Sequence, residues 1–583
     1  MISLKGLAME QHIIERAQAW GKDSYFSDSD REEINQLLKN LDQNGQELTE
    51  RFYRDLEFGT GGLRAPMGMG QNRMNKYNVR RATQALCEII KKNFGTGSAV
   101  ISYDSRNNSK KFAEEAAGVF AANGIKAIIF KALTPTPMLS YAVRYYKAQA
   151  GIMVTASHNP PIYNGYKAFW NDGAQVVPPI DKEIINAYNS LNNWSLVQFM
   201  PFEEALQSGL AEWTDEKVDN SFYDMIKKEV IQDPTLCRDF GKDISIVYTA
   251  LHGTGQVPCK LISEKLGFTN FYSIPEQALP DGNFSTVKSP NPEDPKALKM
   301  AIDYMLMHNA DVVFGTDPDC DRLGVVVNIN GKPEILNGNQ IGVLMLYYIL
   351  SSKAAKQQIK PGSYAVKSIV TSPLQCSVVE SFGVRMEETL TGFKWMADKI
   401  REIENHHPGH EFIFASEESF GYMPHNKSRD KDGVSSVALM SEIVLYYKKQ
   451  GKNLIQVLDE IYEKYGFYYE SLLSNDYEGI SGTQKINRIM EYFRNFPEAK
   501  FAGEEIESRE DFNLGLRLPK SNVLSFNFKS GNKLFLRPSG TEPKIKFYTM
   551  VRVTQGDLKT KKDLALTKVE EIEAAIRACC EKA

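Results

Sequence analysis

The sequence predicts an α/β protein of four domains, in which three repeated domains with mixed or parallel sheets precede a C-terminal α+β domain. A chain of 583 residues is too long for one hydrophobic core, since domains typically span ~100 to 200 residues. Apolar runs of strand length alternate with helical segments in three successive regions, and the last region changes to an antiparallel hairpin pattern. The expected domains, arranged around one central cleft, are residues 1–213, 214–328, 329–455 and 456–583.

The first domain begins with polar helical segments and continues as a strand, helix, strand pattern. Residues 99–103 and 127–130 are apolar runs of strand length, and residues 109–123 between them are helical in character. A third apolar run at residues 150–154 must end before the Asn-Pro-Pro of residues 159–161, because proline cannot continue a central strand. This order is typical of a parallel sheet built from strand, helix, strand units.

The loop after the third strand, Thr-Ala-Ser-His-Asn-Pro at residues 155–160, is the centre of the predicted site. Ligands of open α/β sheets bind at the carboxyl ends of the strands, so the hydroxyl of Ser157 is expected to face a substrate. An ordinary turn that contains a serine is the alternative. An acyl hydrolase is disfavoured, because neighbouring strand residues such as Ser157 and His158 point to opposite faces and no GxSxG motif is present.

A glycine-rich loop at residues 57–64 precedes this sheet and ends in Arg64. Its backbone can approach a ligand closely, with the Arg64 guanidinium directed at an anion. The loop is neither a dinucleotide GxGxxG nor a Walker A sequence, so a nucleotide loop of either kind is excluded.

The second domain contains three aspartates at alternate positions, in Asp-Pro-Asp-Cys-Asp-Arg at residues 317–322, directly after the apolar run 311–316. Three carboxylates this close repel one another unless a cation lies between them, and magnesium prefers such oxygen ligands. The spacing also begins an EF-hand loop, but Arg322 and Asn328 stand where that loop needs glycine and glutamate. A solvated acidic turn is the remaining alternative to a metal site.

Two further strand ends carry polar loops. The apolar run 411–415 leads into Ser-Glu-Glu-Ser-Phe-Gly at residues 416–421. In the fourth domain, a hairpin over residues 523–536 is followed by a basic, hydroxyl-rich loop, whose arginine, hydroxyls, backbone amides and lysine form a candidate phosphate site. The candidate residues of this loop are Arg537, Ser539, Gly540, Thr541 and Lys544.

Composition is ordinary for a globular enzyme, with 42% apolar and 24% charged residues and a net charge of -4. There is no basic surplus for nucleic acid. Seven cysteines without CxxC spacing indicate reduced thiols, and no apolar run approaches the ~18 residues of a membrane span. We therefore expect a cytoplasmic protein that binds neither nucleic acid nor membrane.

Four motifs in this order resemble those of the α-D-phosphohexomutases, the family of phosphoglucomutases and phosphomannomutases. The motifs are residues 155–160, 317–322, 417–419 and 537–541, and the similarity extends over essentially the whole chain. The resemblance implies an enzyme that moves phosphate reversibly between O1 and O6 of glucose, through a phosphoserine and a 1,6-bisphosphate intermediate. It implies Mg²⁺ as cofactor, glucose 1,6-bisphosphate as activator, sugar phosphates as partners, and a monomer or weak dimer.

The resemblance also implies roles for individual residues. Ser157 would carry the phosphoryl group and hold the metal together with Asp317, Asp319 and Asp321. Lys167 would transfer a proton at the sugar hydroxyl, which requires neighbouring cations to lower its pKa. The rest of the cationic group around the phosphate would be Arg64, His158 and Arg322. The substrate-binding residues would be Glu417, Ser419, Lys394, Arg537, Ser539, Gly540, Thr541 and Lys544.

Several positions differ from the pattern of many family members. Phe420 and Tyr422 replace a glycine and a histidine of the sugar loop, and Pro318 and Cys320 replace a glycine and an alanine of the metal loop. These differences look more like the branch with phosphoglucomutase-2 and phosphopentomutase-type enzymes. Pentose and mannose phosphates therefore remain alternative substrates. Outside this class, the alternatives are a magnesium phosphatase that uses Asp319 or Asp321 as nucleophile and a non-catalytic phosphosugar-binding protein.

Overall fold

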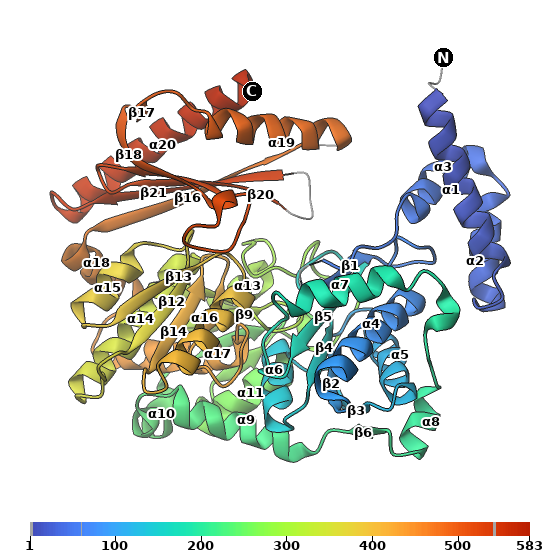
Figure 1. Ribbon diagram of the computed structural model, residues 1–583. Helices are drawn as coiled ribbons and strands as arrows, with labels where there is room; N and C mark the ends of the chain where they lie inside the picture. The colour runs from blue at the N-terminus through green and yellow to red at the C-terminus, as the bar shows by residue number, and fades with distance from the viewer. Residues whose placement is uncertain (1–3, 60, 478, 540–543) are drawn as a thin grey trace. The chain divides into compact units, whose positions relative to one another are not determined.

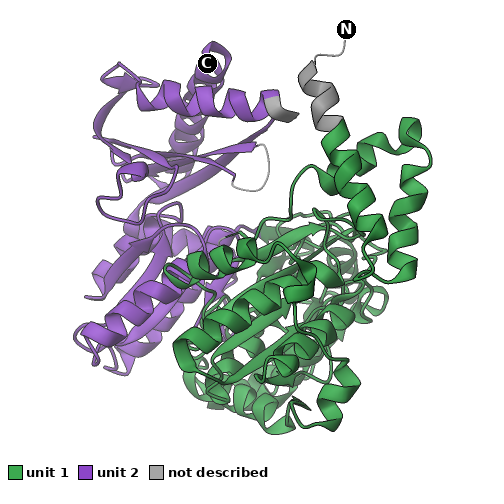
Figure 2. Cartoon of the chain, turned by 45° about the vertical axis from the view of Figure 1, so that its right-hand side comes forward, with its two compact units in different colours: residues 1–335, 425–441 green, residues 336–424, 442–583 purple. Residues whose placement is uncertain are grey.

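The computed structural model describes residues 4–59, 61–477, 479–539 and 544–583. It divides into two compact units, shown in different colours in Figure 2. Unit 1 contains residues 1–335 and 425–441, and unit 2 contains residues 336–424 and 442–583. Helix α17, Gly433–Lys449, begins in unit 1 and ends in unit 2.

Unit 1 opens with three helices, coloured blue in Figure 1: α1 Leu4–Lys22, α2 Asp28–Leu38 and α3 Leu41–Phe52. The side chains of Ser27 and Asn40 accept backbone N–H groups of the first turns of α2 and α3, which explains why the helices begin there. Their apolar faces enclose an aromatic cluster in which Trp20 stacks on Phe26 with ring centroids 3.7 Å apart. The polar helical segments predicted at the start of the chain therefore form a small helical group with its own aromatic core.

A six-stranded sheet follows in unit 1, with strand order β1-β5-β4-β2-β3-β6. Strands β2, β3, β4 and β6 are parallel, whereas β5 and β1 run antiparallel to their neighbours. Val100 and Met153 belong to one core and Ile101 and Ile152 to another, so both faces of the sheet are buried, as a parallel sheet requires. The strands are β1 Gly62–Pro66, β2 Ser98–Tyr103, β3 Lys126–Ile129, β4 Ala150–Val154, β5 Tyr163–Trp170 and β6 Ala211–Trp213. The helices are α4 Lys76–Phe94, α5 Ser109–Ala122, α6 Thr136–Tyr145, α7 Ile180–Ser190 and α8 Phe202–Gln207.

The second sheet of unit 1 has five strands in the order β11-β10-β9-β7-β8. Strand β7 pairs in parallel with β8 and β9, and β10 returns antiparallel along β9. The strands are β7 Ile246–Thr249, β8 Phe271–Ser273, β9 Val312–Thr316, β10 Leu323–Ile329 and β11 Lys332–Leu336. The helices are α9 Glu216–Glu229, α10 Pro234–Phe240, α11 Gln256–Leu266, α12 Pro275–Ala278 and α13 Lys299–His308.

Unit 2 begins with a four-stranded sheet in the order β13-β12-β14-β15. The first three strands are parallel and β15 is antiparallel to β14. The strands are β12 Tyr364–Ser368, β13 Arg385–Thr389, β14 Phe412–Glu417 and β15 Gly421–Met423. The accompanying helices are α14 Gly338–Ala355, α15 Leu374–Ser381, α16 Phe393–His406 and α18 Leu454–Tyr465.

The last part of unit 2 is a six-stranded antiparallel sheet in the order β16-β21-β20-β19-β18-β17. The hairpin predicted over residues 523–536 is present as β19 and β20. The strands are β16 Phe467–Asp476, β17 Lys500–Phe501, β18 Glu504–Asp511, β19 Leu524–Phe528, β20 Lys533–Pro538 and β21 Lys544–Val553. The helices are α19 Gly479–Arg494 and α20 Leu558–Lys582.

Three of these sheets share one local design. A parallel strand ends, the chain turns, and the next strand returns antiparallel beside it, as in β4 and β5, β9 and β10, and β14 and β15. The three polar loops singled out in the sequence are these turns. Throughout the described part of the chain, no helix is both long enough and apolar enough to cross a bilayer.

Candidate active site

Ser157 lies in the turn between β4 and β5 and is almost fully buried, with 4% of its surface exposed. Its backbone has a left-handed φ of 51°, and its N–H donates to Thr155 Oγ1 at 2.8 Å. The hydroxyl donates to Asp317 Oδ2 at 2.8 Å and lies 3.1 Å from His158 Nδ1. Unit 1 therefore brings the serine loop and the aspartate loop into direct contact.

Arg106 holds the serine loop in place, and sequence reasoning missed it. Its guanidinium donates to the backbone carbonyls of Ser157 at 2.6 Å and Asn159 at 2.5 Å, and also to those of Pro160 and Tyr163. It is buried beside Asp104, with Nε 3.3 Å from Oδ2. Its position in the sequence could have indicated this role. Arg106 follows the carboxyl end of β2, which lies next to β4 in the sheet, and functional residues of such sheets lie at this edge.

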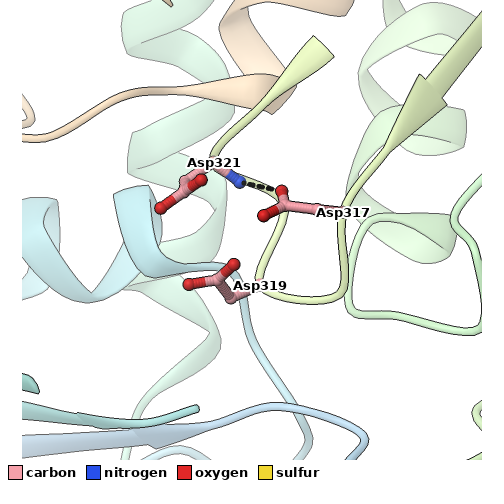
Figure 3. A group of neighbouring side chains, drawn as sticks. All are labelled: Asp317, Asp319 and Asp321. Atoms are coloured by element: carbon pink, nitrogen blue, oxygen red, sulfur yellow. Dashed lines mark hydrogen bonds between the residues drawn. The ribbon is translucent and has the colours of Figure 1, made fainter. Parts of the chain in front are cut away.

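The three aspartates predicted to bind metal lie in the turn between β9 and β10 and form a compact buried group (Figure 3). One carboxylate oxygen from each of Asp317, Asp319 and Asp321 lies within 4.8 Å of the others. Asp317 Oδ1 accepts the backbone N–H groups of Asp321 at 3.1 Å and of Arg322 at 3.0 Å, which fixes the loop. Oδ1 of Asp319 and Oδ1 of Asp321 are buried without a hydrogen-bond partner among the described residues.

This group has the properties of a site for a hard cation. Burial, followed by the charges of Asp321 and Asp319, raises the pKa of Asp317 well above its ordinary range. A divalent cation would remove that repulsion and would also satisfy the two unpartnered carboxylate oxygens. The residues present therefore fit a metal ion held by oxygen ligands.

Two lysines surround the aspartates. Lys167 on β5 places Nζ 2.6 Å from Asp319 Oδ2 and 3.3 Å from Asp321 Oδ2. Burial lowers its pKa, but the two carboxylates outweigh burial and the pKa of Lys167 is raised. This differs from the lowered pKa expected for a base, because the nearest charged groups are carboxylates rather than cations.

Lys431 is the second of these lysines and was not predicted. Its Nζ lies 3.1 Å from Asp321 Oδ2 and 3.2 Å from Asp430 Oδ1. It precedes α17, in the segment 425–441 that packs into unit 1. The charged run at residues 429–432 before an apolar helix was the signal that could have found it.

The remaining predicted cations of unit 1 lie around the same loops. Arg64 on β1 donates to Asn159 Oδ1 at 3.0 Å, and the guanidinium of Arg322 is hydrogen-bonded to Glu293. Burial, then the charges of Arg322 and Arg64, holds the pKa of His158 well below its ordinary range. His158 is therefore neutral at pH 7, and the positive charge around Ser157 comes from arginine and lysine.

In unit 2, the turn between β14 and β15 carries Glu417 and Ser419. The Glu417 carboxylate accepts the N–H of Gly392 at 2.5 Å, which connects this turn to the start of α16, where Lys394 lies. Ser419 is half-buried in the turn. Burial, then Glu417, raises the pKa of Glu418 to about 7.

The basic loop of unit 2 follows β20. Arg537 is the penultimate residue of this strand. The N–H of Ser539 donates to the carbonyl of Lys544 at 2.8 Å, and Lys544 Nζ lies 3.2 Å from Asp476. The charge of Arg537 lowers the pKa of the half-buried Glu418 and partly offsets the effects of burial and of Glu417. The predicted residues Gly540 and Thr541 lie outside the described residues.

A buried hydroxyl beside three carboxylates and several fixed cations suits the transfer of a phosphoryl group. The carboxylates can hold a divalent cation, and the cations can balance the charge of the phosphoryl oxygens.

Comparisons with known proteins point to one family. Residues 55–193, 221–330 and 337–465 match the alpha/beta/alpha domains I, II and III of phosphoglucomutase/phosphomannomutase. The phosphoglucomutase of Staphylococcus epidermidis is 34% identical over 529 residues, 88% of this chain and 94% of that protein. The phosphoglucomutase of Staphylococcus saprophyticus is 35% identical over 532 residues, with coverage of 88% and 94%.

Solved structures share the fold. Parafusin (pp63), a phosphoglucomutase of Paramecium, matches with a TM-score of 0.69 at 18% identity and covers 91% of this chain and 96% of that chain. A phosphoglucomutase/phosphomannomutase family protein of Burkholderia thailandensis matches with a TM-score of 0.64 at 18% identity, with coverage of 90% and 97%. The chain therefore belongs to the α-D-phosphohexomutase family, the family of phosphoglucomutases and phosphomannomutases.

Proposed function

We propose that the chain is a phosphoglucomutase that moves phosphate reversibly between O1 and O6 of glucose, through a phosphoserine at Ser157 and a 1,6-bisphosphate intermediate. The observation that carries this proposal is the contact of Ser157 Oγ with Asp317, inside a buried group of three aspartates. A hydroxyl beside a cation site is a suitable acceptor and donor of phosphate. The staphylococcal relatives, named phosphoglucomutases, support the choice of glucose.

Mg²⁺ is the metal proposed for Asp317, Asp319 and Asp321, with an oxygen of the phosphorylated Ser157 as a further ligand. When bound, the metal would neutralise negative charge on the transferring group. The chain itself prepares the site, since backbone N–H groups of Asp321 and Arg322 hold Asp317 in its orientation. Glucose 1,6-bisphosphate is the proposed activator, because it can phosphorylate Ser157.

Other residues of unit 1 have proposed roles at the reacting phosphate. Arg64, His158 and Arg322 would bind its oxygens, and Lys167 would transfer the proton of the sugar hydroxyl. The contact of Lys167 Nζ with Asp319 Oδ2 supports its place beside the proposed metal ligands. Because these carboxylates raise the pKa of Lys167, the amine must release its own proton before it can accept one from the hydroxyl. In unit 2, the proposed substrate-binding residues are Glu417, Ser419, Lys394, Arg537, Ser539, Gly540, Thr541 and Lys544.

The structure gives a packing role to one of the residues that depart from the family pattern in the sugar loop. Tyr422, which replaces the histidine of many family members, is buried and donates its hydroxyl to the carbonyl of Gly338 at 3.2 Å. Its hydroxyl thus serves packing between β15 and α14. The replacement at Tyr422 therefore does not decide between glucose and ribose, and the choice of glucose rests on the staphylococcal relatives.

The test is an assay of the purified protein with Mg²⁺ on the 1-phosphates of glucose, mannose, ribose and deoxyribose. Each is measured with and without glucose 1,6-bisphosphate, and both isomerised sugar phosphate and inorganic phosphate are scored. We expect isomerisation of glucose 1-phosphate, stimulated by the bisphosphate. Release of inorganic phosphate without isomerisation would instead identify a phosphatase.

Ser157→Ala is the matched control for this assay. Without the hydroxyl there is no phosphate acceptor, so we expect isomerisation to fall at least ~10³-fold while sugar phosphate binding, measured by calorimetry, remains. Isomerisation near the parent rate would show that Ser157 is not the phosphate acceptor.

A further inference from the structure

Unit 1 contains a cavity of about 450 Å³ that the proposed reaction does not use. It lies between the start of α6, one side of α9, the first turn of α11 and the segment after α12. Much of its wall is apolar, and Val257 and Leu279 on its rim are 71% and 76% exposed. Its size and apolar character are those of sites that take small organic molecules.

Three polar side chains in the wall have oxygens without partners. Oδ1 of Asp219, Oγ1 of Thr254 and Oε1 of Gln256 are buried and make no hydrogen bond among the described residues. Thr254 is only 2% exposed. The other end of the Gln256 amide donates to Ser273 Oγ at 2.6 Å, which fixes Oε1 as the free acceptor.

These oxygens define the chemistry of a ligand. A carboxylate and an amide oxygen only accept hydrogen bonds, so the ligand must supply N–H or O–H donors. Burial, followed by the charge of Glu216, raises the pKa of Asp219 only to about 6, so the carboxylate is mainly ionised at pH 7.5. No ion pair to Asp219 occurs in the described part of the chain, and a protonated amine would supply both the charge and the donors.

The walls of the cavity also support the aspartate loop. The N–H of Thr254 donates to the carbonyl of Pro318 at 2.8 Å, and the N–H of Thr136 at the start of α6 donates to the carbonyl of Asp319 at 2.9 Å. Gly253 packs so closely that a Cβ there would lie 2.3 Å from Pro318 Cα. A molecule held against Thr254 therefore touches a residue that is bonded directly to the loop.

We propose that this cavity is a second ligand site, for a small aromatic or apolar molecule that carries a primary amine, and that its occupation changes how the aspartate loop binds a divalent cation. The apolar walls bind the body of the ligand, and Asp219, Thr254 and Gln256 bind the ammonium group.

The test uses the full chain at pH 7.5 and phenethylamine as the probe, with 2-phenylethanol as its uncharged counterpart. Binding is measured by calorimetry. We expect saturable binding of the amine and at least ~10-fold weaker binding of the alcohol, because only the amine meets the carboxylate with a charge. Equal affinity for the two molecules, or no saturable binding of the amine, would overturn the site.

Two variants on α9 separate this site from general attraction to an acidic surface. Asp219→Asn should weaken amine binding ~10-fold, whereas Asp224→Asn, which alters an exposed carboxylate on the same helix, should not change it. Thermal melting confirms that both variants are folded. Unchanged binding in Asp219→Asn, or equal losses in both variants, would contradict the assignment.

Coupling to the loop is measured without turnover, as the Mn²⁺ titration of the protein with and without saturating phenethylamine. A shift of the Mn²⁺ midpoint by ~3-fold or more in either direction is expected for the parent and not for Asp219→Asn. Identical midpoints in the parent would overturn the coupling.

Discussion

Ser157 has a backbone conformation that non-glycine residues seldom adopt, with φ at 51°. Such strain persists where the surroundings impose it. Here the N–H of the residue is bound by Thr155 and its carbonyl by Arg106, so the hydroxyl is held toward Asp317 before any ligand arrives. Arg106 is therefore a positioning residue for the serine.

Arg106→Lys tests this role. The lysine keeps a positive charge beside Asp104 but has one nitrogen, which cannot reach the four carbonyl groups that the guanidinium binds. We expect kcat for glucose 1-phosphate to fall about 10- to 100-fold with a smaller change in KM. The control is Arg54→Lys, which changes an exposed arginine. A kcat equal to that of the parent would refute the positioning role.

Glu470 on β16 makes stability depend on pH. Its Oε1 is buried without a partner among the described residues, and burial raises its pKa to about 7. The ordinary pKa is 4.5, so between pH 4.5 and 7 the folded state keeps a proton that the unfolded chain has lost. Folding stability from this group therefore falls as pH rises through that window, by at most about 3 kcal/mol.

Glu470→Gln removes the titrating group and keeps its shape. We expect the variant to melt at a higher temperature than the parent at pH 8 and at the same temperature at pH 5, where the parent carboxyl is already protonated. Glu581→Gln, at an exposed glutamate, is the control. The same difference between variant and parent at both pH values would show that burial of the charge is not the cause.

At the scale of single residues, the sequence predicted functional residues that lie in short local motifs, but it did not predict residues whose partners are distant in the sequence. Ser157 and the three aspartates were predicted because each follows an apolar run and has a distinctive pattern of neighbours. Arg106 binds backbone carbonyls more than fifty positions away, and Lys431 lies in a segment that the sequence assigned to the third domain. The sequence around each residue marks it as polar at the end of a strand or before a helix, but the partner of each depends on tertiary packing.

At the scale of elements, the sequence predicted the parallel strands but not the antiparallel strands that follow the functional turns. Strand β15 has three residues, and β5 contains polar and glycine positions that break an apolar run. Their hydrogen bonds to β14 and β4 determine that they are strands. The sequence therefore predicted that a strand ends at each of the three loops. Only the structure shows that the next strand runs back antiparallel beside the first.

The start of α6 is joined to the aspartate loop through Thr136. Its hydroxyl donates to Asp319 Oδ2 at 2.9 Å, and its N–H donates to the carbonyl of the same residue at 2.9 Å. If Asp319 binds the proposed metal ion, this hydroxyl would orient it as a ligand.

Thr136→Val keeps the shape of the side chain and removes the hydroxyl. We expect the apparent affinity for Mg²⁺ to fall about 10-fold, measured as the Mg²⁺ dependence of isomerisation. Thr567→Val on α20, whose hydroxyl donates to the carbonyl of Asp563 in the same helix, should leave the titration unchanged. An unaltered Mg²⁺ titration in Thr136→Val would show that the Thr136 hydroxyl does not affect metal binding.

At the scale of the whole molecule, the four sheets agree with the predicted α/β and α+β architecture. The three predicted boundaries between the four domains stay predictions. The division of the chain into two units could not be read from the sequence, because unit 1 recruits residues 425–441 from beyond the first part of unit 2. Arg144 donates to the carbonyl of Asn426 at 2.6 Å, and Gln175 donates to Asp430 at 2.6 Å.

We expect residues 1–335 to need this segment for stability. A fragment in which a long flexible linker joins residues 425–441 to residue 335 should melt several degrees higher than residues 1–335 alone, because buried Asp321 regains Lys431. A fusion with the order of residues 425–441 scrambled is the control. Equal melting temperatures for all three proteins would show that the segment adds nothing to unit 1.

The two-part construction of unit 1 also sets an order of events on the ribosome. Asp321 is synthesised well before Lys431, and the residues between them that belong to unit 2 must emerge first. At ~5 to 20 residues per second, this delay is on the order of 5 to 20 s. A nascent chain therefore exposes an unfinished first unit while the second is being made, and that interval is when a chaperone would protect it most effectively.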